Sequence, residues 1–455
     1  MALLSNIRRN HAYNLSTLKR QPLAELSGAV GDLGTFLPLA IALAMNRTVS
    51  LPATLVLSGF FNITTGVFFG IPLPVQPMKA VAAAAIANKF TPQEIAAAGI
   101  FVGGCVMVFS VTGLLKWFAR MVPIPVVKGI QFGAGLSLVL SAGTNMKSVL
   151  HWTTPWFDNY LWVGAAFVGL LLANIYRRLS YGLILFIACV MIASVRISSE
   201  NDTPQFALWK PTREDIVVPD AQAWKTGIVE AGLGQLPLTT LNSVLAVVYL
   251  AAELLPSLGS PSMTAVGYSV GLMNLIGCWF GAMPICHGSG GLAAQYHFGA
   301  RSGASVIMLG LFKIIIGVLF GETILSLLYK FPTSFLGIMV IAAGLQLASV
   351  GESLNTEKAW DLAERQQRNP ANGLPTTRGQ VQPLIKDDER RERWNVMLAT
   401  MSMLLAFKND GIGFLAGMTC HWAYQISGII DMMNRYLEQG RIRLEANQDN
   451  RQTEP

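Results

Sequence analysis

Residues 70–87 read GIPLPVQPMKAVAAAAIA, and this stretch decides how the rest of the chain must fold. Its three prolines, Pro72, Pro74 and Pro77, deny the backbone a regular helix, because proline lacks an N–H donor and disfavours helical geometry in the residue before it. The alanine-rich run that follows is a strong helix former. We therefore predict an extended segment followed by a short helix that begins near Pro77 or Met78.

A second stretch of the same kind occupies residues 281–303, GAMPICHGSGGLAAQYHFGARSG. Pro284 and the glycines at positions 288, 290 and 291 again interrupt the helix, and a short helical run follows. Both stretches lie among long apolar segments, so we interpret them as broken membrane spans. Irregular backbone at membrane depth is stable only where protein or an aqueous cavity satisfies its amides.

The composition of the chain makes a lipid bilayer its main solvent. Of the 455 residues, 52% are hydrophobic and 13% are charged, and the mean hydropathy is +0.46, which is more apolar surface than a water-soluble core hides. The net charge of +7 comes from Lys and Arg between apolar segments, so we expect no nucleic-acid partner. The five cysteines have no metal-ligand spacing, and the sequence has neither an HExxH motif nor a clustered His/Asp constellation, so we expect neither an enzyme nor a bound metal or cofactor.

Stretches of about 20 mainly apolar residues, the length that crosses a bilayer as a helix, recur along the chain. We predict an all-α polytopic membrane protein with about fourteen spans, seven in each half. The spans of the first half run near residues 24–45, 51–69, 75–90, 93–115, 123–142, 158–176 and 181–196. Those of the second half run near residues 224–250, 261–281, 287–298, 302–321, 332–350, 394–407 and 411–430.

The charges between the spans predict which side of the membrane each connection faces. Lys and Arg concentrate in the even-numbered connections, above all in residues 351–393, whereas the 197–223 connection carries more acids than bases. Both termini are therefore expected in the cytosol. The predicted organisation is a basic N-terminal flank at 1–23, a first repeat at 24–196, a non-cytosolic loop at 197–223, a second repeat at 224–430 interrupted by the cytosolic loop at 351–393, and a cytosolic tail at 431–455.

The two halves of the chain resemble each other. The matching segments are GDLGTFLPLA at 31–40 with AGLGQLPLTT at 231–240, GIPLPV at 70–75 with FGAMPI at 280–285, and FGAGLSL at 132–138 with IAAGLQL at 341–347. The paired positions, separated by 199, 210 and 209 residues, are Pro38 and Pro237, Pro74 and Pro284, and Gly135 and Gly344. An odd number of spans per half places the copies in opposite orientation, which is the inverted-repeat plan of secondary transporters.

The two broken spans would aim the N-termini of two short helices at one central point from opposite sides. Free N–H groups and positive dipole ends at that point favour an anion, and neither segment supplies a carboxylate to attract a cation. The candidate substrate-binding residues are Gln76, Lys79, His287, Gly288, Ser289, Gly290 and Gly291. Other interpretations stay open: Lys79 could reach the membrane interface, His287 could cap a helix, and the glycines could serve close helix packing.

Acidic residues inside the spans are candidates for ion coupling. Asp32 and Glu230 fall within the first span of each half, where a charge is costly, so each is expected either to exchange a proton during transport or to pair structurally. Glu25 lies at the cytosolic edge of its span and is expected to be solvated.

At the broken spans the sequence resembles the eukaryotic molybdate transporter family, the short relatives of the sulfate permeases. The similar segments are GAVGDLGTFLPL at 28–39, PVQPMKAVAA at 74–83 and residues 281–303. The resemblance implies a fourteen-span fold of two inverted seven-span repeats, with a core and a gate domain, shared with sulfate permeases and nucleobase symporters. The chain ends soon after its last span, so the C-terminal regulatory domain of larger sulfate permeases is expected to be absent.

The resemblance also implies oxyanion transport with molybdate as the favoured cargo, and it assigns substrate binding to the seven residues named above. A sulfate transporter is the nearest alternative, because the two dianions share one shape, and an anion channel is a more distant one. The sequence leaves the coupling ion, the direction of flux and a homodimeric state open. The protein is expected in the plasma membrane or in an internal membrane, vacuolar, endoplasmic reticulum or mitochondrial.

Overall fold

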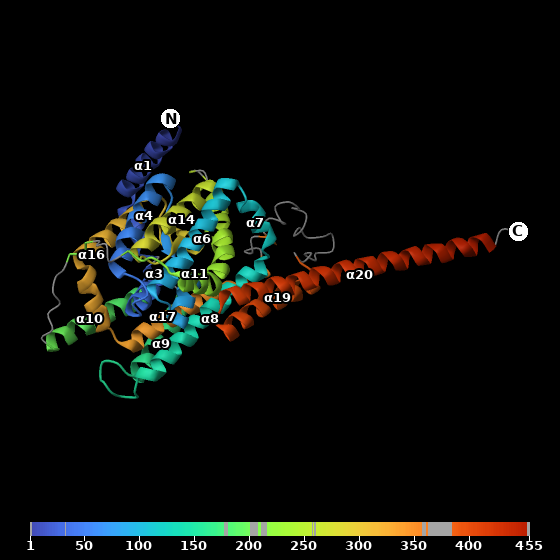
Figure 1. The fold of residues 1–455 in the computed structure, drawn as a ribbon. Coiled ribbons are helices and arrows are strands. Elements are labelled where there is room, and N and C mark those ends of the chain that lie inside the picture. Colours follow the sequence, from blue (N-terminus) through green and yellow to red (C-terminus); the bar gives the residue numbers. More distant parts are fainter. Residues whose placement is uncertain are drawn as a thin grey trace.

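Helices occupy the chain in the order that the apolar stretches predict. The computed structural model describes residues 2–31, 33–176, 181–200, 208–210, 216–256, 258, 261–356, 361–362 and 385–452 (Figure 1). The elements of the first half are α1 (Ala2–Arg20), α2 (Pro22–Gly31), α3 (Leu33–Met45), α4 (Leu51–Phe69), β1 (Val75–Pro77), α5 (Lys79–Asn88), α6 (Pro92–Thr112), α7 (Leu115–Met121), α8 (Ile124–Val149), α9 (Tyr160–Tyr176) and α10 (Tyr181–Glu200).

The second half repeats this order of elements. They are α11 (Ala221–Thr226), η2 (Gly227–Gly232), α12 (Leu233–Leu238), η3 (Thr239–Leu245), α13 (Ala246–Leu254), α14 (Met263–Gly277), η4 (Cys278–Phe280), β2 (Ile285–His287), α15 (Ser289–His297), α16 (Ala304–Tyr329), α17 (Thr333–Ala348), η5 (Ser349–Ser353), α19 (Asp387–Phe407) and α20 (Asp410–Gln452). Helix α20 continues well past residue 430, the predicted end of the last span, and projects from the body (Figure 1).

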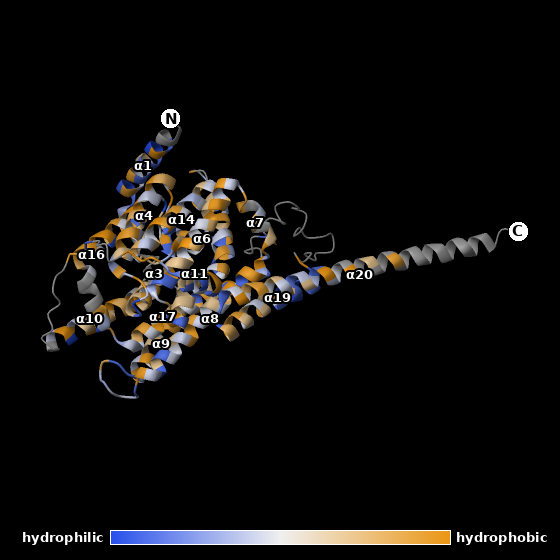
Figure 2. Cartoon of the chain, viewed as in Figure 1, coloured by the Kyte–Doolittle hydropathy of each residue, from blue (hydrophilic) through white to orange (hydrophobic). Residues whose placement is uncertain are grey.

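Seven helices in the described part of the chain are long and apolar enough to cross a bilayer. They lie at Leu51–Phe69, Pro92–Thr112, Ile124–Val149, Ala221–Leu254, Met263–Phe280, Ala304–Gly321 and Thr333–Ser353. The other predicted spans correspond to the α2–α3 pair, the short helices α5 and α15, and α9, α10, α19 and α20. Hydrophobic residues dominate the helices of the body, whereas hydrophilic residues gather on α1 and α19 (Figure 2).

The first span of the second half is a continuous helical rod from Ala221 to Leu254. Its winding widens to π-helical turns in η2 and η3, although the sequence pattern predicts a regular span. A π-helical turn inserts an extra residue and re-aims the side chains beyond it, and such turns often occur at functional sites. Residues of η3 line the cavity described below.

Two short strands meet at the centre of the fold, one from each broken span. Strand β1 pairs antiparallel with β2, so that Gln76 lies opposite Cys286. The strands begin at residues 75 and 285 and the helices that follow begin at residues 79 and 289, so both pairs are 210 residues apart. This spacing equals that of the repeat found in the sequence. The pattern predicts extended backbone in both segments but does not predict that they pair.

An asparagine on the preceding helix satisfies the backbone of each strand. The Asn62 side chain on α4 accepts a hydrogen bond from the Val75 N–H at 2.8 Å. On α14, the Asn274 side chain accepts from the Ile285 N–H at 2.9 Å and donates to the Ile285 carbonyl at 2.6 Å. Both asparagines are fully buried. Each therefore supplies the hydrogen bonds that an irregular segment at membrane depth requires.

Replacement of Asn274 by Leu is expected to destabilise the protein. The change leaves the N–H and C=O of Ile285 unpaired in a buried site, at a cost of about 1–3 kcal/mol for each group. The measurement is the thermal unfolding midpoint of the purified protein in detergent, with Asn6→Leu as the control, because Asn6 lies exposed on α1. Equal midpoints for the two variants would contradict the anchoring role of Asn274.

Helices from the two halves pack against each other through glycines. Helix α4 lies along α16, and a Cβ added at Gly59 would lie 2.6 Å from the Gly310 carbonyl oxygen. Helix α14 lies along α6, where a Cβ at Gly103 would lie 2.7 Å from the Asn274 Cβ. Helix α8 crosses α17, where a Cβ at Gly344 would lie 2.6 Å from the Gly135 carbonyl oxygen. In each of these pairs a helix of one repeat packs closely against a helix of the other, so the two repeats form one body.

Candidate functional site

A cavity of about 250 Å³ lies where the half-helices α5 and α15 begin. The described part of its wall comes from β1, β2 and the half-helices that follow them, from α8, from the rod of α12, η3 and α13, and from α17 and η5. The wall residues that offer polar side chains or glycine backbone are Gln76, Lys79, Lys128, Gln131, Gln235, Asn242, Ser243, Gly288, Ser289, Gly290 and Gln346. Five of the seven sequence-predicted site residues are among them: Gln76, Lys79, Gly288, Ser289 and Gly290.

The N-terminus of α15 is open towards the cavity. The N–H groups of Gly291 and Leu292 both donate to the Gly288 carbonyl, at 3.0 and 3.1 Å. The amides of Ser289 and Gly290 precede them in the first turn, where an α-helix has no internal acceptor to offer. A Cβ at Gly290 would meet nothing within 4 Å, so the space beside it is empty. Two amides, the Ser289 hydroxyl and the positive end of the helix dipole can therefore act on an anion here.

The N-terminus of α5 is capped by the other half of the protein. The Gln235 side-chain oxygen accepts from the Ala80 and Val81 amides at 3.0 and 3.3 Å, and its NH₂ group donates to Thr239 at 2.8 Å. The sequence-based prediction of two equivalent open helix ends therefore describes α15 alone. What α5 contributes to the wall is the Lys79 side chain. Gln235 was not predicted, because the amides that it caps lie more than 150 residues away in the sequence.

Two lysines face this cavity, and the described wall contains no carboxylate. Lys79 begins α5, and Lys128 lies one turn into α8. The Lys128 ammonium group donates to the Val350 carbonyl at 3.1 Å and to the Ser353 hydroxyl at 2.6 Å, so it also ties α8 to η5. Lys128 was missed in the sequence, although the same signal that identified Lys79, a cation inside an apolar span, was present. Asp361 lies near enough to act on Lys128 but is paired with Arg393, so two positive charges face a described wall without a carboxylate, which suits a doubly charged anion.

Gln131 adds a further polar group to the wall. Its side chain is only 6% exposed, and its amide oxygen accepts no hydrogen bond from the part of the chain that the structure describes. A buried amide is costly unless something pairs with it. The amide oxygen of Gln131 is therefore available to a water that accompanies a bound anion, since an acceptor cannot bind the anion itself.

His287 and Gly291 are close to the cavity but do not line its described wall. His287 is fully buried, with Nε2 2.9 Å from the Ser269 hydroxyl and Nδ1 3.4 Å from the Pro74 carbonyl. The carbonyl can only accept, so Nδ1 carries the proton and Nε2 accepts from Ser269 in the neutral ring. The ring thus joins β2 to α14 and to the residue before β1. Gly291 lies against β1, where a Cβ would be 2.6 Å from Pro74 Cγ.

The acidic residues that the sequence singled out lie elsewhere. Glu230 accepts a hydrogen bond from Asn88 at 3.1 Å, at the far end of α5. Asp32 lies outside the described residues. Glu25, expected to be solvated, is fully buried, and its carboxylate accepts from the Arg301 N–H and the Ser302 hydroxyl, both at 3.0 Å. These contacts hold α2 against the loop that follows α15.

A family model described as "Molybdate transporter of MFS superfamily" matches residues 24–138 and 227–347. Every described wall residue of the cavity except Val350 falls within these two segments. Molybdate transporter 2 of Arabidopsis thaliana is 37% identical, over 75% of this chain and 81% of that protein. Molybdate transporter 1 of Chlamydomonas reinhardtii is 30% identical, over 87% of this chain and 90% of that protein.

Solved structures share the fold at low sequence identity. The transmembrane domain of the cyanobacterial bicarbonate transporter BicA matches with a TM-score of 0.54 and 14% identity, covering 88% of this chain and 97% of that one. SLC26A9 matches with a TM-score of 0.59 and 14% identity, covering 91% of this chain and 66% of that one. The chain is thus a multi-pass membrane protein with the fold of two inverted seven-span repeats.

Proposed function

The chain belongs to the molybdate transporter family, and we propose that it carries molybdate across a bilayer as a secondary transporter. The observation that supports this most strongly is the cavity between the half-helices. Its described wall presents Lys79, Lys128 and the open end of α15, and it contains no carboxylate. A tetrahedral dianion would accept hydrogen bonds from the Ser289 and Gly290 amides while the two lysines balance its charge.

The size of the cavity suits a small hydrated oxyanion. A volume of about 250 Å³ equals that of roughly eight waters at about 30 Å³ each. An ion with four oxygens can therefore enter with part of its hydration shell, and the polar wall can replace the rest. Molybdate and sulfate are alike in shape and charge, so selection between them would depend on how closely the wall fits the larger molybdate ion.

The way the site is built supports alternating access. We assign α5, α15 and the paired strands to a rigid core, because buried asparagines and glycines hold them, and we assign α8 and α17 to a gate that closes over them. The repeats at 24–196 and 224–430 would each supply one half of the core and one half of the gate. Movement of the core along the gate would carry the bound ion from one side of the membrane to the other.

The experiment that tests this function is uptake of nanomolar molybdate into cells that lack their own transporter. Saturable uptake that persists in a large excess of sulfate would establish a molybdate carrier. Uptake abolished by sulfate would identify a sulfate or general oxyanion carrier instead. An anion flux that rises without saturation would identify a channel, and the absence of molybdate uptake with the protein in the membrane would overturn the proposal.

Replacement of Ser289 by Ala is expected to weaken molybdate binding. The variant loses the hydroxyl donor but keeps the backbone amides, and one hydrogen bond to a charged ligand contributes about 1.5–3 kcal/mol, equivalent to roughly a ten- to hundred-fold rise in KM. The control is Ser194→Ala, which removes an exposed hydroxyl from α10. An unchanged KM in the Ser289 variant would show that the hydroxyl does not bind the transported ion.

A further inference from the structure

A second cavity, of about 640 Å³, lies at the opposite ends of the helices that form the first. The first cavity uses Lys79 of α5, the α8 segment 124–131 and the α17–η5 segment 346–350. The second uses the C-terminal end of α5, the α8 segment 141–148 and the α17 segment 333–340. Lys128 and Asn145, one in each wall, are 17 residues apart on α8, which corresponds to about 25 Å along the helix.

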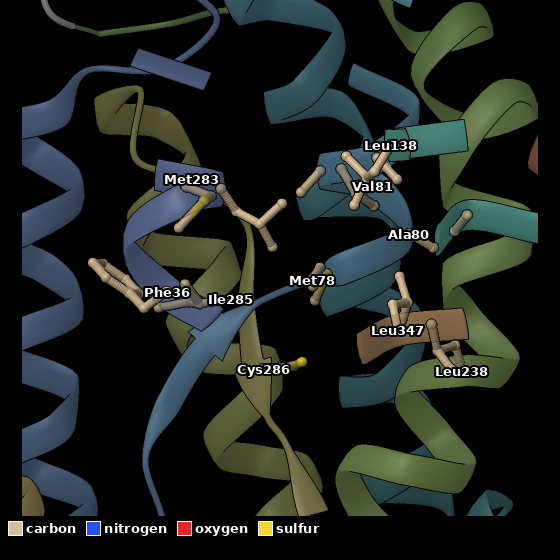
Figure 3. Close-up of a cluster of buried hydrophobic side chains, with 14 of the residues drawn as sticks. Phe36, Met78, Ala80, Val81, Leu138, Leu238, Met283, Ile285, Cys286 and Leu347 are labelled. Carbon is tan, nitrogen blue, oxygen red and sulfur yellow. The ribbon is translucent and has the colours of Figure 1, made fainter. Parts of the chain in front are cut away.

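Tightly packed helix separates the two cavities. Between their walls α8 crosses α17 at Gly135 and Gly344, where a Cβ on Gly344 would lie 3.2 Å from Leu138 Cβ. Leu138 belongs to the same buried cluster as Val81 of α5 (Figure 3). Both side chains are at most 1% exposed. The second cavity is therefore a separate compartment facing the other side of the fold.

The described wall of the second cavity also contains two lysines and no carboxylate. Lys89 ends α5 and Lys408 ends α19, and the Asn88 side chain donates to the Lys408 carbonyl at 2.8 Å, which holds the two ends together. Both belong to odd-numbered connections, so the charge pattern predicts that they lie on the same, non-cytosolic side.

Three carboxylates lie near this wall without lining it. Glu230 accepts from the Asn88 side chain at 3.1 Å, and the Thr333 and Ser334 amides donate to the two oxygens of Asp158 at 2.8 Å each. Asp410, two residues beyond Lys408, is buried.

The backbone at the two lysines gives an independent reason to assign them a role. Lys89 and Lys408 have φ angles of +53° and +49°, in the left-handed region that favours glycine at helix C-termini. A lysine at such a position is strained relative to glycine, and here two of them occur at one cavity. Lining this cavity between them are also polar side chains of α8, Ser141, Thr144 and Asn145.

We propose that the second cavity is an oxyanion vestibule, in which Lys89 and Lys408 gather the dianion before it reaches the site between the half-helices. The proposal rests on the proposed function, since it takes the transported ion to be a dianion. The lysines raise the local concentration of the ion without contacting it in the inner cavity. They therefore act on KM for entry from that side and leave the maximal rate unchanged.

The test compares molybdate uptake by Lys89→Gln/Lys408→Gln with uptake by the unmodified protein. At low ionic strength we expect KM to rise about three- to ten-fold at constant maximal rate, because steering by charge is worth at least this much. The difference should shrink at high ionic strength, since the Debye length falls from about 30 Å at 0.01 M to about 8 Å at 0.15 M. Lys147→Gln is the matched control, because Lys147 is exposed at the same end of α8 but does not line the cavity.

A second variant separates charge from folding. Lys89→Gly/Lys408→Gly removes the same charges while placing the residue that the left-handed backbone prefers, so it should fold and show the same rise in KM. An unchanged KM in the glycine variant, or an equal rise of KM in Lys147→Gln, would overturn the proposal that Lys89 and Lys408 gather the ion in this cavity. Molybdate uptake by the unmodified protein is measured in the same cells, so failure of the proposed function would be seen separately.

Discussion

Replacement of Lys79 by Gln is expected to lower molybdate affinity by about ten- to hundred-fold, because a hydrogen bond to a charged partner contributes about 1.5–3 kcal/mol. Lys79 begins α5 and lines the cavity, where the described wall offers only one other cation, Lys128. The measurement is the Kd of purified protein for molybdate, together with KM for uptake. Affinity should recover in Lys79→Arg, which keeps the charge.

The effects of Lys79 and Lys128 on binding are expected to be coupled. Both face one cavity and would balance one dianion. The loss of binding free energy in the double change to Gln should therefore differ from the sum of the losses in the two single changes. Lys147→Gln, at the other end of α8, should leave Kd unchanged. If the Lys79→Gln variant is present in the membrane and its Kd equals that of the unmodified protein, Lys79 does not contribute to molybdate binding.

Replacement of Gly291 by Ala is expected to abolish transport. A Cβ at this position would lie 2.6 Å from Pro74 Cγ and 2.7 Å from Gln76 Cδ, so α15 must shift away from β1. Overpacking of this kind costs about 1–3 kcal/mol, and here it displaces the two elements that form the cavity. The measurement is molybdate uptake, normalised to the amount of protein in the membrane.

The control for this change is Gly143→Ala. Gly143 lies on α8, and a Cβ there would meet nothing within 4 Å. Alanine at that position should support transport at the level of the unmodified protein, since it favours the helix and displaces no neighbour. Normal uptake by the Gly291 variant would show that the contact between α15 and β1 is dispensable.

Local chemistry made the broken spans predictable. The three prolines from Pro72 to Pro77 forbid a helix, and the alanines after them favour one, so the predicted start near Pro77 or Met78 lies within two residues of the observed start at Lys79. The repeat was equally accessible, because the spacing of 210 residues between Pro74 and Pro284 recurs in the strands and half-helices. Features that depend on residues adjacent in the sequence, or on a regular spacing between them, could therefore be predicted.

Features that join distant residues could not be predicted in this way. Gln235 caps α5 across the interface between the repeats, and nothing in its neighbourhood in the sequence indicates that partner. Glu25 was expected to be solvated from its position at the edge of a span, but it is buried and accepts hydrogen bonds from the Arg301 N–H and the Ser302 hydroxyl. In both cases the partner is supplied by packing of the second repeat against the first.

His287 shows that a motif leaves the direction of one side chain open. It stands between an extended strand and a glycine-rich helix start, which suggests a side chain that faces the ligand. In the fold its two ring nitrogens are instead directed at Ser269 and Pro74. The alternation of side chains along β2 decides this, because neighbouring residues on a strand point to opposite faces and Cys286, not His287, lies on the cavity wall.

Anomalous diffraction at the molybdenum absorption edge, from crystals of the protein soaked in molybdate, tests the central claim most directly. The account predicts a molybdenum peak in the cavity of about 250 Å³, within hydrogen-bonding reach of the Ser289 and Gly290 amides and beside Lys79. A peak absent from this cavity at saturating molybdate, in protein that transports the ion, would contradict it.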